Sequence, residues 1–240
     1  MTHGTAVVCG TGRTTRAIAE MFASRGAPVA IVAEDEGEAE PIVSACTPYG
    51  VARWYRSAFD DESDLGGTLT DVHDQLGPIR SVVLVAEQGP SAALDRVALD
   101  IWERALHRGL TKIFLMAKHS IGLLEAAGEG TFTAVLPLCG SRGVVADAAH
   151  TAAFHGVIGL VRSMALDFGS RGVRSNAVIH GVLANPMEGT PEIPAGRVGT
   201  PEEVAQLVLH LSSPAASYTN GTVQYVDGAM SAGYFEREDE

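Results

Sequence analysis

Three side chains able to exchange protons or to attack an electrophile are Cys139, His150 and His180. An unperturbed histidine has a pKa near ~6.5, so either ring could act as a general acid or base at neutral pH without a neighbouring cation. A cysteine beside a histidine could also form a covalent intermediate. The set points to non-redox proton transfer or covalent chemistry, and a loop cysteine with surface histidines of no joint role is the alternative.

A glycine-rich turn near the start of the chain is a second candidate site. Gly10 and Gly12 follow a short apolar stretch at 5–9, and backbone N–H groups in such a turn bind the pyrophosphate of dinucleotides. Arg13 could pair with a phosphate, and Glu34 could accept hydrogen bonds from the adenosine ribose. Two glycines without a third also suit any tight strand-to-helix turn, and the acidic residues around Glu34 also suit a solvated charge run.

The composition of the 240-residue chain limits its partners. A net charge of -12 repels phosphate backbones, which argues against nucleic acid. The longest apolar runs are far shorter than the ~18 residues of a membrane span, and the chain starts without a secretory-signal pattern, so we expect a cytoplasmic protein with no membrane partner. The three cysteines lack metal-ligand spacing, and we expect no metal site.

Strand-like apolar segments alternate with helix-like segments along the whole chain. This alternation predicts an α/β fold in which helices cover both faces of a parallel sheet, and no linker or repeat divides residues 1–240 into more than one domain. The predicted strands lie at 5–9, 28–33, 51–56, 79–86, 130–136, 173–179 and 222–226. The predicted helices lie at 14–25, 38–47, 61–76, 92–126 with at least one break, 147–170 and 201–213.

Four motifs between residues 159 and 228 resemble those of the short-chain dehydrogenase/reductase family, and the resemblance spans essentially the whole chain. They are GLVRSMA at 159–165, VRSNAV at 173–178, RVGTPEEVA at 197–205 and GTVQYVDG at 221–228. The resemblance implies a single Rossmann-like domain with a doubly wound parallel sheet of about seven strands. It also implies NAD or NADP as the cofactor, held through Gly10, Gly12, Arg13 and Glu34.

The same resemblance locates four catalytic positions, and each holds a different residue from the family's. The Asn position falls at Gly109, the Ser position at Pro137, the Tyr position at His150 and the Lys position at Phe154. In the family the Tyr transfers a proton, the Lys lowers its pKa and holds the nicotinamide ribose, and the Ser polarises the substrate oxygen. Only His150 could exchange a proton, so the standard redox site is dismantled. The glycine at 109 is better explained by close packing or a kink than by catalysis.

Two positions near the expected cofactor also depart from the family. Thr15 stands where the third glycine of the turn belongs. After the fourth strand the family places NNAG beside the cofactor, and this chain has Ala86-Glu87-Gln88-Gly89. Glu87 would therefore set a negative charge close to any bound dinucleotide.

Three hypotheses for the function remain. The first is a non-catalytic or auxiliary subunit, either a homo-oligomer or a partner of an active paralogue, because small residues in 147–170 suit the helix contact that relatives use between subunits; the same face could instead pack on the chain's own sheet. The second is a non-redox enzyme for elimination, cyclisation or isomerisation of a small metabolite, with His150 as acid and base. The third is an atypical NAD(P)-dependent oxidoreductase.

Overall fold

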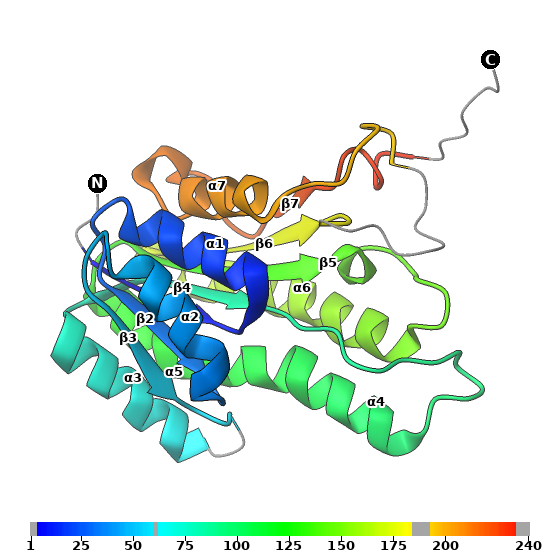
Figure 1. Cartoon of the computed structure of the whole chain (residues 1–240), viewed down its shortest axis with the longest axis horizontal. Helices are drawn as coiled ribbons and strands as arrows, with labels where there is room; N and C mark the ends of the chain where they lie inside the picture. The colour runs from blue at the N-terminus through cyan, green and yellow to red at the C-terminus, as the bar shows by residue number, and fades with distance from the viewer. Residues whose placement is uncertain (1–3, 60–61, 184–192, 234–240) are drawn as a thin grey trace.

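Seven parallel strands form one sheet through the middle of the molecule (Figure 1). The computed structural model describes residues 4–59, 62–183 and 193–233. The strands are β1 (Thr5–Cys9), β2 (Val29–Ala33), β3 (Ala52–Arg56), β4 (Ile79–Val85), β5 (Gly130–Pro137), β6 (Val173–His180) and β7 (Val223–Val226). Their order is β3-β2-β1-β4-β5-β6-β7, which confirms the predicted doubly wound, Rossmann-like fold.

The strands are almost continuously apolar because helices cover the sheet on both faces. Along β1, Val7 and Cys9 join the core on one face, and Ala6 and Val8 join the core on the other. The central strands are nearly all buried, and each predicted strand agrees with the observed one to within one residue at either end. Buried parallel strands therefore gave a clear signal in the sequence.

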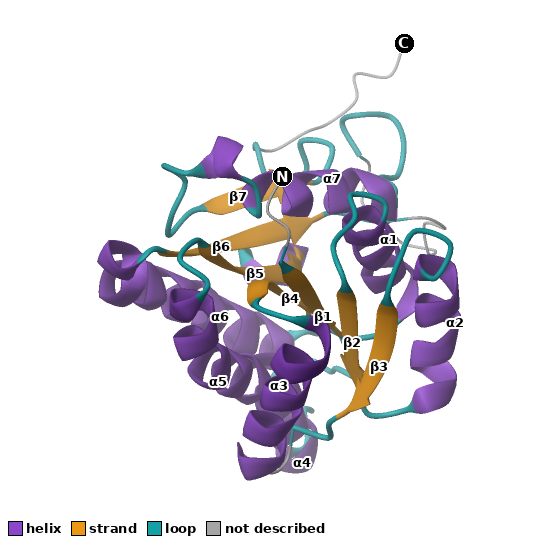
Figure 2. Cartoon of the chain, turned by 90° about the vertical axis from the view of Figure 1, so that its left-hand side faces the viewer, coloured by secondary structure: helices purple, strands orange, loops and turns teal. Residues whose placement is uncertain are grey.

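The helices form two layers (Figure 2). One face carries α1 (Gly12–Ala23), α2 (Glu36–Cys46) and α7 (Pro201–Leu211), and α1 packs against both of the others. The other face carries α3 (Glu62–Leu76), α4 (Leu99–Leu106), α5 (Lys112–Ala126) and α6 (Ala148–Phe168). Short 3₁₀ turns lie at Leu138–Gly140, Gly169–Arg171 and Pro214–Ala216. In the described part of the chain, no helix is long and apolar enough to cross a membrane.

The helix predicted over 92–126 is wrong at its start. Residues 86–98 form a loop, and helical structure begins only at Leu99. The loop is held by tertiary contacts, among them a hydrogen bond of 2.7 Å from the Ser91 hydroxyl to the Ala146 carbonyl. The predicted break is a π-helical turn, His107–Thr111, between α4 and α5. Such turns accommodate one extra residue in a helix, and this one contains Gly109.

The motif at 197–205 builds the start of α7. Thr200 and Glu203 form a capping box, in which Glu203 accepts the Thr200 N–H at 2.8 Å. Arg197 donates to the same carboxylate at 2.6 Å, and this pairing, with the Thr200 N–H, lowers the pKa of Glu203 to about 2. The motif thus fixes the entry of the chain into α7.

Candidate functional site

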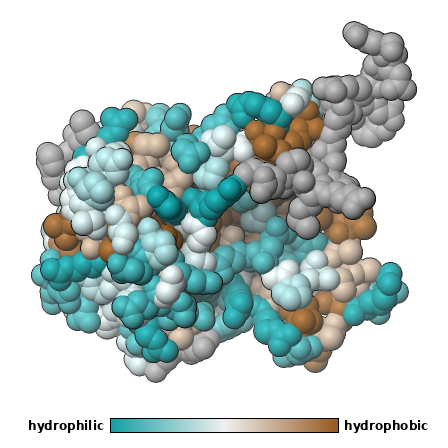
Figure 3. All heavy atoms as spheres, in the orientation of Figure 1, coloured by the Kyte–Doolittle hydropathy of each residue, from teal (hydrophilic) through white to brown (hydrophobic). Residues whose placement is uncertain are grey.

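The crevice between the carboxyl ends of β1 and β4 is the candidate site, because the strand order reverses there. A cavity of about 350 Å³ opens beside it, on a face of the molecule that is largely hydrophilic (Figure 3). Gly10 and Glu34 both line this cavity, so the structure brings together two of the predicted cofactor residues. Arg13 lines a separate cleft of about 460 Å³ between α1 and α7, and Gly12 is exposed at the first position of α1.

The glycine-rich turn is shaped by two positive φ angles and a threonine. Gly10 has φ 118° and Gly12 has φ 80°, values that favour glycine. A Cβ on Gly10 would lie 3.0 Å from the Val85 carbonyl oxygen, so the turn passes directly over the end of β4. Thr15, at the third-glycine position, is buried and donates its hydroxyl to the Thr11 carbonyl at 2.7 Å. A side-chain hydrogen bond therefore secures this turn.

The carboxylate of Glu87 lies against the open side of the turn. Its Oε1 accepts hydrogen bonds from the Thr11 backbone N–H at 3.1 Å and from the Thr11 hydroxyl at 2.9 Å. A dinucleotide pyrophosphate needs the N–H groups at this end of the helix. The residues around the turn do not fit a nicotinamide dinucleotide, because its phosphates would meet this carboxylate.

His150, in the first turn of α6, has both ring nitrogens engaged. The ring is 3% exposed. Its Nδ1 donates to Asp147 Oδ1 at 2.6 Å, and its Nε2 accepts the Gly89 N–H at 3.0 Å. Because Nε2 is an acceptor, the ring is a neutral imidazole with its proton on Nδ1. In this arrangement no nitrogen of His150 faces a substrate.

Asp147 is the centre of a buried polar network. Its side chain is nearly inaccessible, and Oδ2 accepts the Gln88 side-chain amide at 2.9 Å. The same amide nitrogen lies 3.3 Å from the Cys139 sulfur. Asp147 occupies the N-cap position of α6, yet its oxygens bind Gln88 and His150 instead of helix N–H groups. The network thus joins the loop after β4 to the loop after β5 and to α6.

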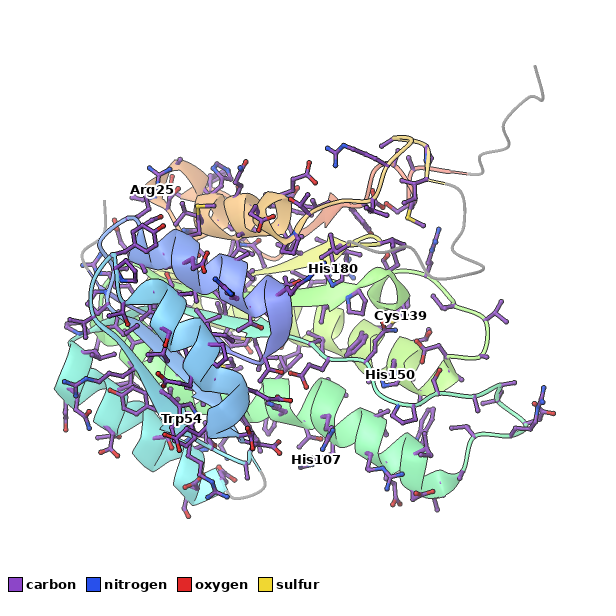
Figure 4. The ribbon with its side chains drawn as sticks, in the orientation of Figure 1. Arg25, Trp54, His107, Cys139, His150 and His180 are labelled. Atoms are coloured by element: carbon purple, nitrogen blue, oxygen red, sulfur yellow. The ribbon has the colours of Figure 1, made fainter. Side chains whose placement is uncertain are left out.

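Figure 4 labels the other two predicted reactive residues, Cys139 and His180. Both are in less reactive states. Cys139 is 1% exposed, and burial together with nearby Asp147 raises its pKa to about 12. Burial lowers the pKa of His180, whose Nδ1 donates to the Gly181 carbonyl at 2.8 Å. The network joins Cys139 to His150 through Gln88 and Asp147, and the described contacts do not link His180 to it.

The remaining family positions are packed as core. Phe154 is fully buried, with its ring centroid 5.8 Å from that of His150. A Cβ on Gly109 would lie 2.9 Å from Phe154 Cε1 and 3.1 Å from Ala153 Cβ. The aromatic ring therefore fills the space that a side chain at 109 would need, which confirms close packing as the reason for this glycine. Pro137 ends β5 without a side-chain donor.

Comparison with known proteins identifies the family. A family model described as enoyl-(acyl carrier protein) reductase matches residues 14–231. The chain belongs to the short-chain dehydrogenase/reductase family. It is 33% identical over 230 residues to cis-4-hydroxycyclohexanecarboxylate dehydrogenase of Sinomonas cyclohexanicum, covering 90% of this chain and 91% of the relative. A crystal structure from Burkholderia xenovorans that is assigned to the short-chain dehydrogenases/reductases superposes with a TM-score of 0.89, 25% identity and coverage of 97% and 98%.

A second relative differs from the dehydrogenases by its name. The chain is 29% identical over 225 residues to inactive 2-(S)-hydroxypropyl-CoM dehydrogenase 2 of Xanthobacter autotrophicus, covering 86% of this chain and 96% of the relative. Short-chain dehydrogenases/reductases of similar sequence thus include both dehydrogenases and a protein named inactive.

Sequence reasoning did not find the partners of His150. Asp147 precedes it by three residues, a spacing that places two side chains on one side of a helix start, and this was the signal that could have found it. Gln88 and Gly89 are far away in sequence and left no such signal. Among the described residues, no cluster of three or more His, Cys, Asp or Glu side chains could hold a metal ion.

The contact between Gly109 and Phe154 predicts the effect of a small substitution. Gly109→Ala should lower the free energy of unfolding by about 1–2 kcal/mol, because its methyl group overpacks the aromatic ring. Adding Phe154→Leu should make the double variant more stable than the sum of the two single effects. Chemical denaturation measures all three. Gly159→Ala on α6 is the control, because open space surrounds it, and it should be neutral or stabilising by up to about 1 kcal/mol.

Replacement of His150 tests the buried network. His150→Phe leaves Asp147 and the Gly89 N–H without their partners, so the free energy of unfolding should fall by about 3 kcal/mol. Limited proteolysis should then cut the loop at 86–98 faster. His155→Phe, an exposed histidine one turn further along α6, should leave both measurements unchanged. Equal effects of the two variants would contradict the network.

Thiol titration tests Cys139 as a nucleophile. Burial raises the pKa of Cys9 to about 12 and of Cys46 to about 11, so with Cys139 all three thiols should resist a disulfide reagent at pH 8 until the protein is denatured. These folded values exceed the unfolded value of 9.0, so protonated thiols favour the folded state; that contribution is complete below pH 9.0, falls as pH rises above it, and is lost by about 11 for Cys46 and about 12 for Cys9 and Cys139. Rapid modification of native Cys139 at pH 8 would restore the covalent hypothesis.

Proposed function

We propose that this chain is a non-catalytic subunit that associates with a catalytically active short-chain dehydrogenase/reductase and supports its assembly. One observation carries the proposal: the positions that perform the reaction in the family are used here for packing. Phe154 fills the space over Gly109, and the Asp147 carboxylate and the Gly89 N–H hold His150 on both sides.

Hydride transfer to or from a carbonyl requires a group that moves the accompanying proton. His150 is the one candidate among the four replaced positions, and its acceptor nitrogen is already bonded to Gly89. Members of a catalytic unit are strongly non-additive, and loss of one costs orders of magnitude in rate. Four replacements together therefore support a chain without redox activity of its own. The relative named inactive is consistent with this role.

The outward face of α6 is the surface we propose for association. Ala153 and Gly156 pack inside the chain, where a Cβ on Gly156 would lie 2.9 Å from Leu110 Cδ2. Part of the small-residue face is therefore used internally, against the π-helical turn at His107–Thr111. Ala152 and Gly159 are exposed, and Leu166 on the same helix is 85% exposed. Small residues beside an exposed leucine suit close approach of a helix from a second chain.

A second candidate function is acid/base catalysis by His150 on a small metabolite. The short hydrogen bond to Asp147 favours it, because a carboxylate orients the ring and stabilises the imidazolium in catalytic pairs. His150 also lines a cavity of about 80 Å³ that contains Arg104 and Arg108. For catalysis the Gly89 N–H would have to release Nε2, and this requirement makes it the second choice.

Activity and association assays test the subunit proposal together. The purified chain should oxidise or reduce no alcohol or ketone in a broad panel with NAD or NADP, to a limit of ~10⁻⁴ of an active family member. Tagged at its chromosomal locus and purified after mild cross-linking, it should carry a family member that retains the catalytic Tyr and Lys. That partner should lose stability or activity when this chain is removed.

A surface substitution supplies the matched control. Gly159→Arg on the exposed face of α6 should abolish co-purification of the partner without lowering the thermal stability of the isolated chain. Gly143→Arg, in an exposed loop with nothing within 4 Å, should leave co-purification intact. Redox turnover by the isolated chain, whether or not it depends on His150, would establish an atypical oxidoreductase and overturn the subunit proposal.

A further inference from the structure

Glu87 lies in the loop that follows β4, next to the turn that follows the neighbouring parallel strand β1. Cys9 at the end of β1 is paired with Leu84 on β4, so the residues just beyond them meet above the sheet. Glu87 and Thr11 are 76 positions apart in the sequence and are joined by two hydrogen bonds to one carboxylate oxygen. The contact closes the crevice at its phosphate-binding end.

Helix α1 receives its compensating negative charge from Glu87. A helix N-terminus carries a partial positive charge, which an acidic residue in the first turn or a side-chain cap usually balances. The fully described first turn of α1 contains no acidic residue, and the Thr11 side chain makes no cap hydrogen bond. Thr11 instead donates its N–H and its hydroxyl to Glu87. The carboxylate thus makes contacts that a bound phosphate oxygen would make.

The backbone next to Glu87 is anchored by the buried network. Gln88 donates to Asp147, and the Gly89 N–H donates to His150. These two bonds fix the two residues that follow Glu87, so its carboxylate is presented to the turn without a large loss of loop entropy. The residue at the family's Tyr position therefore helps to position the acidic side chain.

We propose that Glu87 is an internal anion that occupies the pyrophosphate position of this chain and excludes dinucleotides from it. The other charged groups around the same cavity are Glu34 and Asp35 between β2 and α2, Glu38 in the first turn of α2, and Arg108 and Lys112 from the π-helical turn and the start of α5. The two cations would favour a phosphate once the carboxylate is neutralised. Exclusion by Glu87 holds whether or not the chain has a catalytic partner.

Calorimetric titration with NADH, ADP and adenosine tests this role on the full-length protein. The wild-type chain should show no saturable binding of NADH or ADP with a Kd below about 1 mM. Glu87→Gln and Glu87→Ala should each bind NADH and ADP at least about tenfold more tightly than wild type. Adenosine has no phosphate, so its affinity should not change in either variant.

Glu38→Gln is the matched control, because it removes one negative charge from the lining of the same cavity at a residue with no expected contact to a dinucleotide. An equal gain in NADH affinity in Glu38→Gln would reduce the effect to net charge and overturn the proposal. Unchanged NADH and ADP affinity in both Glu87 variants, with folding verified by circular dichroism, would also overturn it, as would sub-millimolar NADH binding by the wild type. Association with an active family member should be the same in Glu87→Gln and wild type, so failure of the subunit proposal is read out separately.

Discussion

The pair of hydrogen bonds that hold the His150 ring between Asp147 and Gly89 is the constraint on which the site depends. A buried carboxylate is costly unless its oxygens are hydrogen-bonded, and Asp147 accepts one bond from the Gln88 amide and one from the neutral imidazole. The bonds connect the loop after β4 to the start of α6. Removing the ring would therefore leave the Asp147 carboxylate and the Gly89 N–H without this hydrogen-bond partner, and it would free the loop after β4 from α6.

The same constraint determines how the neighbouring residues on α6 and in the π-helical turn pack. With a neutral imidazole fixed above it, Phe154 fills an apolar space beside Ala153 and leaves room only for glycine at 109. Gly109 lies in the π-helical turn and has no side chain for chemistry. Gly109, His150 and Phe154 stand at positions that the resemblance predicts to be catalytic, and they pack against one another.

Most of the apolar core lies outside the candidate site. The two apolar clusters that flank the sheet are made by strands and by the inward faces of the helices, and few of their members belong to the site. A superposition with a TM-score of 0.89 at 25% identity is consistent with this separation. Function in this fold depends on loops at the carboxyl ends of the strands.

The sequence by itself determined the strands, the parallel doubly wound class of the sheet and the family, because buried parallel strands are apolar runs and the motifs at 159–165 and 197–205 are local. The family resemblance also predicted that His150 and Gly109 stand at positions where the family has other residues. Only the tertiary structure decided what those residues do. The prediction of a helix from residue 92 was wrong for the same reason that the Gly89 contact was missed. Hydrogen bonds between the loop at 86–98 and the start of α6 join segments more than fifty residues apart, and such contacts leave no periodic pattern in the sequence.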